Sequence, residues 1–399
     1  MNFQNVNPLN VRLNMVSGNL LPMTDDGSSF PILWRIYGAS IWLLEIIQMC
    51  VLIPGCIIVP KEKALKDGLI GIAITIEVVF TTVRIYSRKA LVRRLIQKLN
   101  NIMCIKDEIM KNMVIATRKP MEMLFKFYWI AGIVSLIMWF TEPFMLIFKK
   151  NSFVYMDYRM PIVLSKEPFS TGIFLLGSLI VMLSSMYIFT KKVSVDSYVI
   201  NMILLITAQY KYIALKLSMI FRNERLQNNY SSSNKKQHYS EINFYAEKEI
   251  KSICHHHNAI LHITLMLQEL LAMSLSITYL NSVFRFCCIA IMVISIPSSD
   301  LNEKAVFIMY ASGGVVQLYI LCSCVQQLLD ASTEITDQAF HGEWYRYGTS
   351  IQRTFIFMIM ANNLELKLST FERYNLSLSS FMTILNQSYS IALILLKTN

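Results

Sequence analysis

The sequence predicts an all-α polytopic membrane protein with seven transmembrane helices in a single domain, residues 1–399. The chain is 54% hydrophobic and only 16% charged, and its mean hydropathy is +0.44, whereas soluble domains carry about 25% charged residues. It contains only 13 Gly and 10 Pro, which favours long helices over turn-rich β structure. It lacks the short alternating segments of an outer-membrane barrel.

Seven apolar stretches approach the roughly 20 residues that a transmembrane helix needs. The second stretch is short and flanked by charge. The fourth continues through a more polar segment, 198–220, which we expect to be a helix that leaves the membrane. The spans are expected at residues 36–59, 68–83, 127–148, 172–189 with its extension, 270–296, 305–329 and 376–396.

The basic residues predict the orientation of these helices. Of the 37 Lys and Arg residues, 11 lie in 84–126 and 10 lie in 191–251. Because cytoplasmic loops are enriched in Lys and Arg, we expect a cytoplasmic N-terminus and an extracellular C-terminus. The polar start MNFQNVNPLNVRLN has no signal-peptide pattern and agrees with this orientation. The net charge of +11 is therefore assigned to loops of a protein that contacts lipid, and no nucleic-acid partner is expected.

Both basic segments are also amphipathic. In RIYSRKALVRRLIQKLNNIM, Leu91, Leu95, Leu99 and Ile102 recur at helical spacing and form one stripe. The stretch YAEKEIKSICHHHNAILHI before the fifth span has a similar pattern. We expect these helices to be cytoplasmic extensions that form an anchor region. The segment NNYSSSNKKQHYS, 228–240, is expected to be a disordered loop.

Motifs of catalysis and of metal binding are weak or missing. The sequence contains no GxSxG, P-loop or HExxH motif, so neither enzyme activity nor a cofactor is expected. The run CHHH at 254–257, with His262 nearby, would offer metal ligands. No carboxylate lies at ligand spacing, so a polar helix face is the favoured interpretation.

Three carboxylates lie within or near the predicted spans, where a charge is costly. Glu45 lies in the first span, Glu77 in the second, and Glu142 near the end of the third. We expect each to pair with a neighbouring helix or to reach the interface. The alternative is a water-filled cavity or an ion path.

The last predicted span carries a polar stripe. Ser379, Thr383, Asn386 and Ser390 fall within about 60° of one another on a helix that turns about 100° per residue. A bare polar stripe is costly in lipid, so this one is expected to face protein or water. Helix–helix hydrogen bonding and a pore wall shared between copies of the helix are both compatible with the spacing.

The C-terminal third carries a recognisable set of residues. An Ala and an aromatic residue precede a Trp, an apolar helix with an Arg follows, and the last span contains Ser-Tyr-Ser. These residues are Ala339, Phe340, Trp344, Arg353, Ser388, Tyr389 and Ser390. The set resembles the end of insect odorant receptors, which have the Ala, aromatic and Trp in the third cytoplasmic loop and a Ser/Thr-Tyr-Ser/Phe element in the last helix. Asp196 after the fourth span and Cys254 before the fifth are similar too.

The resemblance is to the divergent, ligand-tuned receptors, because the longer second cytoplasmic loop of the family's co-receptor is missing. It implies an odorant-gated, non-selective cation channel in the plasma membrane of sensory-neuron dendrites. Four subunits would surround a central pore lined by the last helix. This chain would be the tuning subunit of a heterotetramer with the co-receptor, and its ligand would be a volatile small molecule.

The resemblance also implies an extracellular gate near Ala392, Leu395 and Leu396. An apolar ring at this position would close the pore by dewetting. The face shared by Ala392 and Leu396 lies roughly opposite the polar stripe, so the two interpretations assign the pore to different sides of the helix. The gate at the outer end is the favoured interpretation, and the polar stripe is then expected to pack on neighbouring helices.

The odorant site of that family lies among the outer parts of spans two to six and is mostly apolar, as expected for volatile ligands. Matching helix faces selects ten candidate residues on four spans, each with ordinary helix packing as its alternative. They are Ile76, Val79 and Phe80 in the second span, Ser135 and Trp139 in the third, Phe174, Ser178 and Met182 in the fourth, and Tyr310 and Gly313 in the sixth.

Other membrane proteins fit the sequence less well. A transporter is expected to show an internal repeat and broken helices at matching positions, and no such repeat is found, although residues 311–314 (ASGG) would allow a bend in the sixth span. A G-protein-coupled receptor has its N-terminus outside, against the charge distribution. A gustatory receptor ends in a Thr-Tyr…Gln-Phe signature, and the last span has no Gln-Phe.

Overall fold

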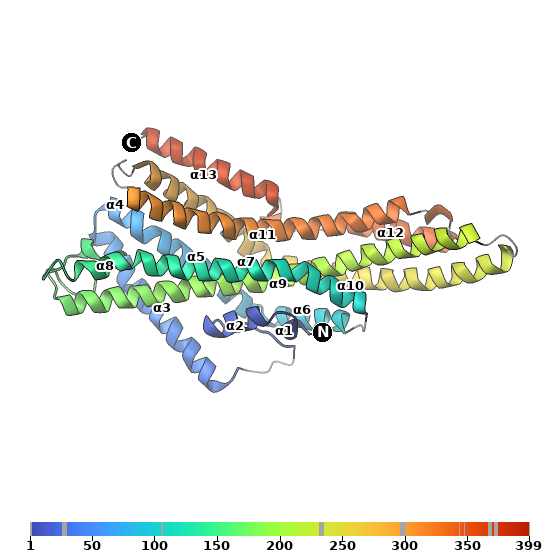
Figure 1. The fold of residues 1–399 in the computed structure, drawn as a ribbon, viewed down its shortest axis with the longest axis horizontal. Coiled ribbons are helices and arrows are strands. Elements are labelled where there is room, and N and C mark those ends of the chain that lie inside the picture. Colours follow the sequence, from blue (N-terminus) through green and yellow to red (C-terminus); the bar gives the residue numbers. More distant parts are fainter. Residues whose placement is uncertain are drawn as a thin grey trace.

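Long helices that lie roughly along one axis make up most of the molecule (Figure 1). Seven of those in the described part of the chain are long and apolar enough to cross a membrane, which confirms the predicted all-α polytopic class with seven spans. The computed structural model describes residues 2–25, 30–104, 107–230, 235–295, 301–342, 344–346, 348–365, 369–370 and 374–398.

The spans are formed by seven long helices, one of which is prolonged by a shorter one. They are α3 (Ile32–Ile58), α5 (Ile70–Ser87), α7 (Glu108–Trp139) with α8 (Thr141–Leu146), α9 (Thr171–Tyr230), α10 (Lys235–Ser295), α11 (Leu301–His341) and α13 (Leu378–Thr398).

Shorter elements connect the spans. The helical ones are α4 (Lys61–Lys63), the π-helical turn η1 (Ala64–Leu69), α6 (Lys89–Met103), the 3-10 turns η2 (Tyr155–Asp157) and η3 (Trp344–Arg346), and α12 (Thr349–Glu365). The sequence analysis does not predict the two-residue strands β1 (Ser369–Thr370) and β2 (Tyr374–Asn375), which pair antiparallel.

Two helices at the N-terminus, α1 (Phe3–Val6) and α2 (Pro8–Val16), pack against the bundle. The sequence analysis does not predict them, because the segment is polar. Phe3 and Leu13 are nevertheless buried in the core. The side chain of Asn14 accepts from Leu21 N at 2.8 Å and donates to Leu21 O at 3.0 Å. Buried amides thus satisfy the local backbone instead of facing water.

The helices α9 and α10 are far longer than a membrane crossing requires. Their 60 and 61 residues correspond to about 90 Å each at about 1.5 Å per residue, against a hydrocarbon core about 30 Å thick. They run side by side to the tip on the right of Figure 1, here called the hairpin end. The predicted continuation of the fourth span as a helix is therefore confirmed.

The loop predicted at 228–240 is wrong for the most part. Helix α9 reaches Tyr230 and α10 begins at Lys235, while residues 231–234 lie outside the described residues. Paired helices propagate at little cost once nucleated, and this outweighs the polar composition of the segment.

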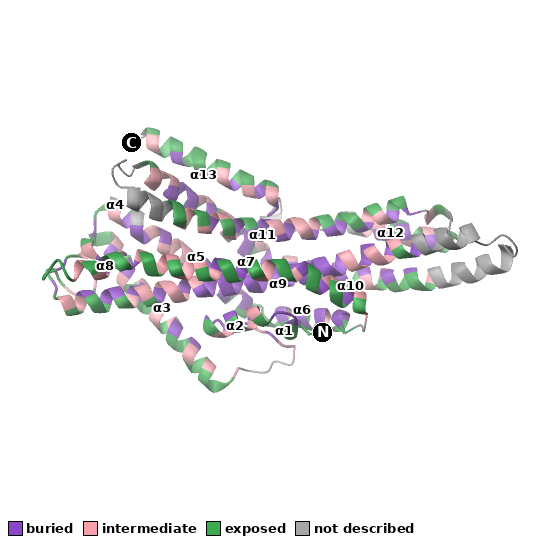
Figure 2. Cartoon of the chain, in the orientation of Figure 1, coloured by how far each residue is buried: buried purple, intermediate pink, exposed green. Residues whose placement is uncertain are grey.

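The middle of α9 forms the centre of the molecule. All residues of 193–209 except Asp196 are buried, and Figure 2 shows the buried residues concentrated in this central region. The hydroxyl of Tyr198 donates to Pro22 O at 2.6 Å, and that of Tyr210 bonds to Thr264 Oγ1 at 3.2 Å. These two hydroxyls are therefore satisfied inside the protein, whereas both side-chain polar atoms of Asn201 are buried without a partner among the described residues.

The helix α6 has the predicted amphipathic arrangement. Leu95 and Leu99 are fully buried in the core, whereas Arg93 and Arg94 are exposed. The apolar stripe is therefore used for packing within the chain, and the basic face is left at the surface.

Residues 147–170 lie at the end of the molecule opposite the hairpin end, near α8 in Figure 1. Their backbone is joined to α3 by a hydrogen bond from Val163 N to Val51 O of 3.1 Å. Gly55 of α3 faces the Pro161 carbonyl, and a Cβ at Gly55 would lie 2.1 Å from that oxygen. This close approach requires glycine.

Candidate functional site

Charged side chains are buried between α5, α9 and the helices around them. Lys192 of α9 donates from Nζ to Glu77 Oε1 at 2.7 Å and to Asp196 Oδ1 at 2.9 Å. Lys192 is 5% exposed and Glu77 is 2% exposed. Removing these charges from water is costly, so the arrangement depends on how completely the remaining polar atoms are satisfied.

Neighbouring helices supply the other partners of the two carboxylates. Glu77 also accepts from Thr278 Oγ1 at 3.0 Å and from the side-chain amide of Asn281, both on α10. Asp196 accepts from Gln317 Nε2 of α11 at 2.6 Å. Four spans are thus tied together by one hydrogen-bonded group, here called the polar cluster and defined by Glu77, Lys192, Asp196, Thr278, Asn281, Arg285 and Gln317.

A second buried ion pair lies on the other side of α9. Lys191 is fully buried, and its Nζ lies 2.8 Å from Glu45 Oε2 and 3.4 Å from the centre of the Trp42 ring. Because adjacent helical residues point about 100° apart, Lys191 and Lys192 reach helices on different sides of α9.

The third carboxylate is paired as well, because Arg159 Nη1 lies 2.6 Å from Glu142 Oε2. All three acidic residues singled out in the sequence therefore have a basic partner. This supports the favoured interpretation of those residues as paired groups.

Arg285 is one of the residues of the polar cluster that the sequence analysis missed. It lies within the fifth span on α10 and is 5% exposed. Its Nη1 donates to Gln317 Oε1 at 3.4 Å. The sequence could have indicated this residue, because it is an arginine inside a predicted span. Charged residues are rare there and are candidates for a functional role.

The candidate ligand residues on α5 and α7 differ in burial. Ile76 is 56% exposed, while Val79 and Phe80 are half-buried. Ile76 precedes the buried Glu77, so its exposed side chain points away from the polar cluster. On α7, Ser135 donates to Ala131 O of its own helix at 2.8 Å, and Trp139 is half-buried.

The candidates on α9 lie near the segment 147–170. Phe174 is fully buried, and its ring stacks on Phe153 with centroids 4.1 Å apart. Met182 and Trp139 pack against the same apolar cluster as Phe174. Ser178 is buried, and its hydroxyl has no hydrogen-bond partner among the described residues. The structure therefore brings Trp139, Phe174 and Met182 together.

The candidates on α11 lie beside the polar cluster. Tyr310 is half-buried and packs against the main core. Gly313 is also half-buried, and a Cβ at that position would have nothing within 4 Å.

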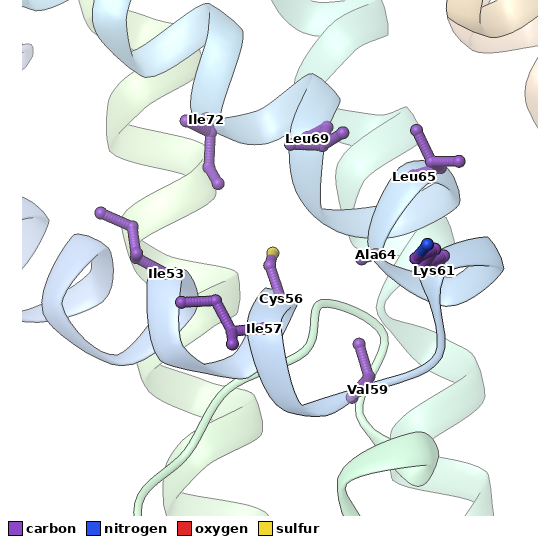
Figure 3. A pocket seen from close by; sticks show the side chains of 9 residues that line it. All are labelled: Ile53, Cys56, Ile57, Val59, Lys61, Ala64, Leu65, Leu69 and Ile72. Carbon is purple, nitrogen blue, oxygen red and sulfur yellow. The ribbon is translucent and has the colours of Figure 1, made fainter.

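An apolar pocket of about 470 Å³ lies between α3, α4, η1 and the start of α5. Figure 3 shows the Cys56 side chain pointing into the space between α3 and η1. None of the ten candidate ligand residues lines it. Its lining residues are Ile53, Cys56, Ile57, Val59, Lys61, Ala64, Leu65, Leu69 and Ile72.

The helix α13 lies at the edge of the molecule and has two contrasting faces (Figure 2). Ile384, Ser388 and Ala392 are buried against the rest of the chain. The opposite face is exposed and includes the whole predicted polar stripe, which is Ser379, Thr383, Asn386 and Ser390.

The three gate candidates occupy different parts of α13. Ala392 is fully buried, Leu396 is half-buried, and Leu395 is 44% exposed. Near Leu395, the apolar side chains of Ile391, Leu393 and Ile394 are exposed too, and so is Lys397.

The histidines of 254–257 contribute to helix packing. His256 Nε2 lies 3.2 Å from Gln209 Oε1, and His257 is buried with its ring against Tyr210. In the part of the chain that the structure describes, no group of three or more His, Cys, Asp or Glu side chains is arranged to hold a metal ion.

Comparison with known proteins gives a family and a fold. A family model described as 7tm odorant receptor matches residues 64–389. Odorant receptors 85d and 67a of Drosophila melanogaster are 21% and 22% identical over 134 and 143 residues, which are 34% and 36% of this chain. These matches span only about a third of the relatives' length, 32% and 34%.

Solved structures match over nearly the whole chain. The olfactory receptor OR5 of Machilis hrabei in complex with eugenol is similar with a TM-score of 0.77 at 12% identity, over 99% of this chain and 98% of that one. The structure of OR5 alone gives a TM-score of 0.75 at 10% identity, over 98% and 97% of the two chains. At these identities the similarity is one of fold.

Proposed function

Because the chain belongs to the 7tm odorant receptor family, we propose that it is the ligand-binding subunit of an odorant-gated cation channel. In this proposal, volatile molecules bind between the spans on the side of the polar cluster away from the hairpin end. Binding favours the open state to the extent that the ligand binds that state more tightly. The pore is lined by α13 and is shared with an odorant co-receptor in a heterotetramer.

The exposed face of α13 is the observation that carries the pore proposal. On α7 the exposed side chains in the membrane are apolar, for example Phe127, Ile130 and Val134, as expected for a helix in lipid. On α13, Thr383, Asn386 and other polar side chains are exposed instead. Since a bare polar face is costly in lipid, we assign it to water or to other subunits around a pore.

The gate belongs at the end of α13 that is near the C-terminus. There the exposed face changes from polar to apolar, with Ile391, Ile394 and Leu395 exposed. A ring of such side chains around the axis would close a pore by dewetting. Among the gate candidates, Leu395 is then the residue that reaches the pore, while Ala392 packs against its own subunit.

The ligand site is assigned to the ten candidate residues of the second, third, fourth and sixth spans. Trp139, Phe174 and Met182 pack in one apolar cluster, and we propose that they form an apolar wall of the ligand site. Tyr310 and Gly313 contribute the wall nearest the polar cluster.

The proposed orientation has a cytoplasmic N-terminus, an extracellular C-terminus and a cytoplasmic hairpin end. It follows from the excess of Lys and Arg in 84–126 and 191–251. The proposed location is the plasma membrane of sensory-neuron dendrites. Antibody access to an N-terminal tag only after permeabilisation would agree with this orientation.

The test is whole-cell current in cells without endogenous receptors. The chain is expressed alone and with an insect odorant co-receptor, and a broad panel of volatiles is applied. We expect odorant-evoked cation current in the co-expressing cells. Silence across the panel, with the protein at the cell surface in both settings, would contradict the proposed function.

A further inference from the structure

Arg285 is a buried cation with spare hydrogen-bond donors. A guanidinium carries five N–H donors. The bond from Nη1 to Gln317 is long at 3.4 Å, and Nε is enclosed without a partner. Unmet donors are costly inside a membrane protein, so the site is suited to an acceptor that arrives from elsewhere.

The charge of Arg285 is already balanced. Arg285 and Lys192 carry two positive charges in the polar cluster, and Glu77 and Asp196 carry two negative charges. Both carboxylates already accept hydrogen bonds, Glu77 from three groups and Asp196 from two. An uncharged acceptor would therefore use the free donors without disturbing this balance.

The helix α11 approaches the Arg285 guanidinium closely through a glycine. Gly314 is buried, and a Cβ there would lie 3.3 Å from Arg285 Nη2. Gly313 next to it has open space where a side chain would stand. One turn earlier, the hydroxyl of Tyr310 is enclosed beside the Arg285 side chain. Enclosed polar atoms of Arg285 and Tyr310 thus lie together where α11 has only glycine next to the guanidinium.

We propose that Arg285 and Tyr310 form the polar end of the ligand site and select neutral volatiles that carry a carbonyl oxygen, such as ketones and esters. The inference rests on the proposed function. A carbonyl oxygen has two lone pairs and so accepts one hydrogen bond from each residue. A hydrocarbon leaves both donors unmet, and a carboxylate adds a negative charge to a neutral cluster.

The test uses probes that differ only at the oxygen. Cells expressing the full chain with the co-receptor receive 2-heptanone or heptane, acetophenone or ethylbenzene, and heptanoic acid. We expect the ketones to activate at concentrations at least about ten-fold lower than their hydrocarbon partners, the change that one hydrogen bond to a charged group gives. Heptanoate is expected to be the weaker agonist when compared with 2-heptanone.

Two variants assign the preference to the two residues. Arg285→Lys keeps the charge balance but loses the planar fork of donors, and Tyr310→Phe removes only a hydroxyl. Each is expected to raise the half-maximal concentration for ketones several-fold relative to that for hydrocarbons. Arg94→Lys and Tyr345→Phe are the matched controls, because both side chains are exposed and neither belongs to the polar cluster.

The outcomes separate this inference from the proposed function. Equal potency of ketones and hydrocarbons, or an equal shift of all agonists in Tyr310→Phe, would overturn the carbonyl preference while leaving an odorant-gated channel. A preference for heptanoate would also overturn it. If Arg285→Lys does not reach the cell surface, the wild-type probe pairs and Tyr310→Phe decide. Absence of current with every volatile class would count against the proposed function itself.

Discussion

Lys192 is the single residue whose loss we expect to be most damaging. In Lys192→Met, the carboxylates of Glu77 and Asp196 would stay buried without their shared partner. Removing one member of a buried ion pair costs about 3–5 kcal/mol, so we expect a large fall in melting temperature of the detergent-purified protein. Arg88→Met is the control, because the pair of Arg88 with Glu269 is exposed and such pairs contribute about 0–1 kcal/mol. Equal losses in the two variants would contradict the role of the cluster.

Asp107, which precedes the first residue of α7, predicts that the stability of the folded protein depends on pH. The hydrogen bond from Tyr212, helped by Lys216, lowers the pKa of this carboxyl below its ordinary 3.8. A lowered folded-state pKa gives stability that is complete above the unfolded-state pKa and is lost as the pH falls through the folded-state pKa.

The variant Asp107→Asn keeps an acceptor for Ile109 N but loses the charge. We expect a lower free energy of unfolding than wild type at pH 7, by less than about 1 kcal/mol because the pair with Lys216 is only partly buried. The difference in stability between wild type and Asp107→Asn is expected to disappear as the pH falls below 3.8. A gap that is the same at pH 7 and pH 3 would rule out a contribution from the carboxylate charge.

Single residues also show where sequence reasoning stops. Glu45 and Glu77 are recognisable from their position in apolar stretches, and pairing is the expected outcome. Their partners are not recognisable, because Lys191 and Lys192 belong to a basic segment that the charge rule assigns to a loop. They turn inward only because α9 continues as a helix through the centre of the molecule. The ten ligand candidates remain predictions.

Among the elements, α13 offers the sharpest test of the pore. In Asn386→Cys, on the exposed face, we expect a charged, membrane-impermeant thiol reagent to reduce the odorant-evoked current of co-expressing cells, because the side chain is in contact with water. Ser388→Cys is the matched control, since Ser388 is 2% exposed and faces its own subunit. The unsubstituted chain already has eight cysteines. It serves as a further control, and the reagent must leave its current unchanged. Block of the Ser388→Cys channel alone would place the pore on the other face.

The contact of α3 with segment 147–170 makes a second prediction at this scale. Gly55→Ala is expected to lower the melting temperature and the surface level, because its Cβ would lie 2.1 Å from the Pro161 carbonyl oxygen and the backbone would have to move. Gly172→Ala near the start of α9 is the control, since a Cβ there meets nothing within 4 Å. A Gly55→Ala protein as stable as the Gly172→Ala protein would show that the segment does not hold α3 closely.

The sequence predicts those helices whose apolar length or helical spacing is distinctive. Apolar length identifies all seven spans, and helical spacing identifies the buried stripe of α6. Composition does not reveal α1 and α2, whose asparagines are buried, or the helical ends of α9 and α10 near residue 230. The spacing on α13 predicts a polar stripe, but only the packing partners determine that this stripe points away from the chain.

At the scale of the whole molecule, the proposed pore requires more than one chain. The polar face of α13 is exposed at the edge of the helical bundle (Figure 2), so it needs other subunits or water to be stable in a membrane. The polar cluster joins α5, α9, α10 and α11 beside the proposed ligand site, and α13 packs on α10 and α11. In the proposed channel, a ligand that shifts these two helices would act on α13, the proposed pore-lining helix, by direct contact.

The most direct measurement of the central claim is current in an excised outside-out patch from cells expressing this chain with the co-receptor. Volatiles that activate whole cells are applied to the patch, with no nucleotide or G-protein activator in the pipette. We predict cation current within milliseconds of each application, because the ligand site and the pore lie in the same assembly. Loss of the response on excision, with recovery only when nucleotide is supplied, would contradict an odorant-gated channel and would favour a receptor that acts through a separate effector.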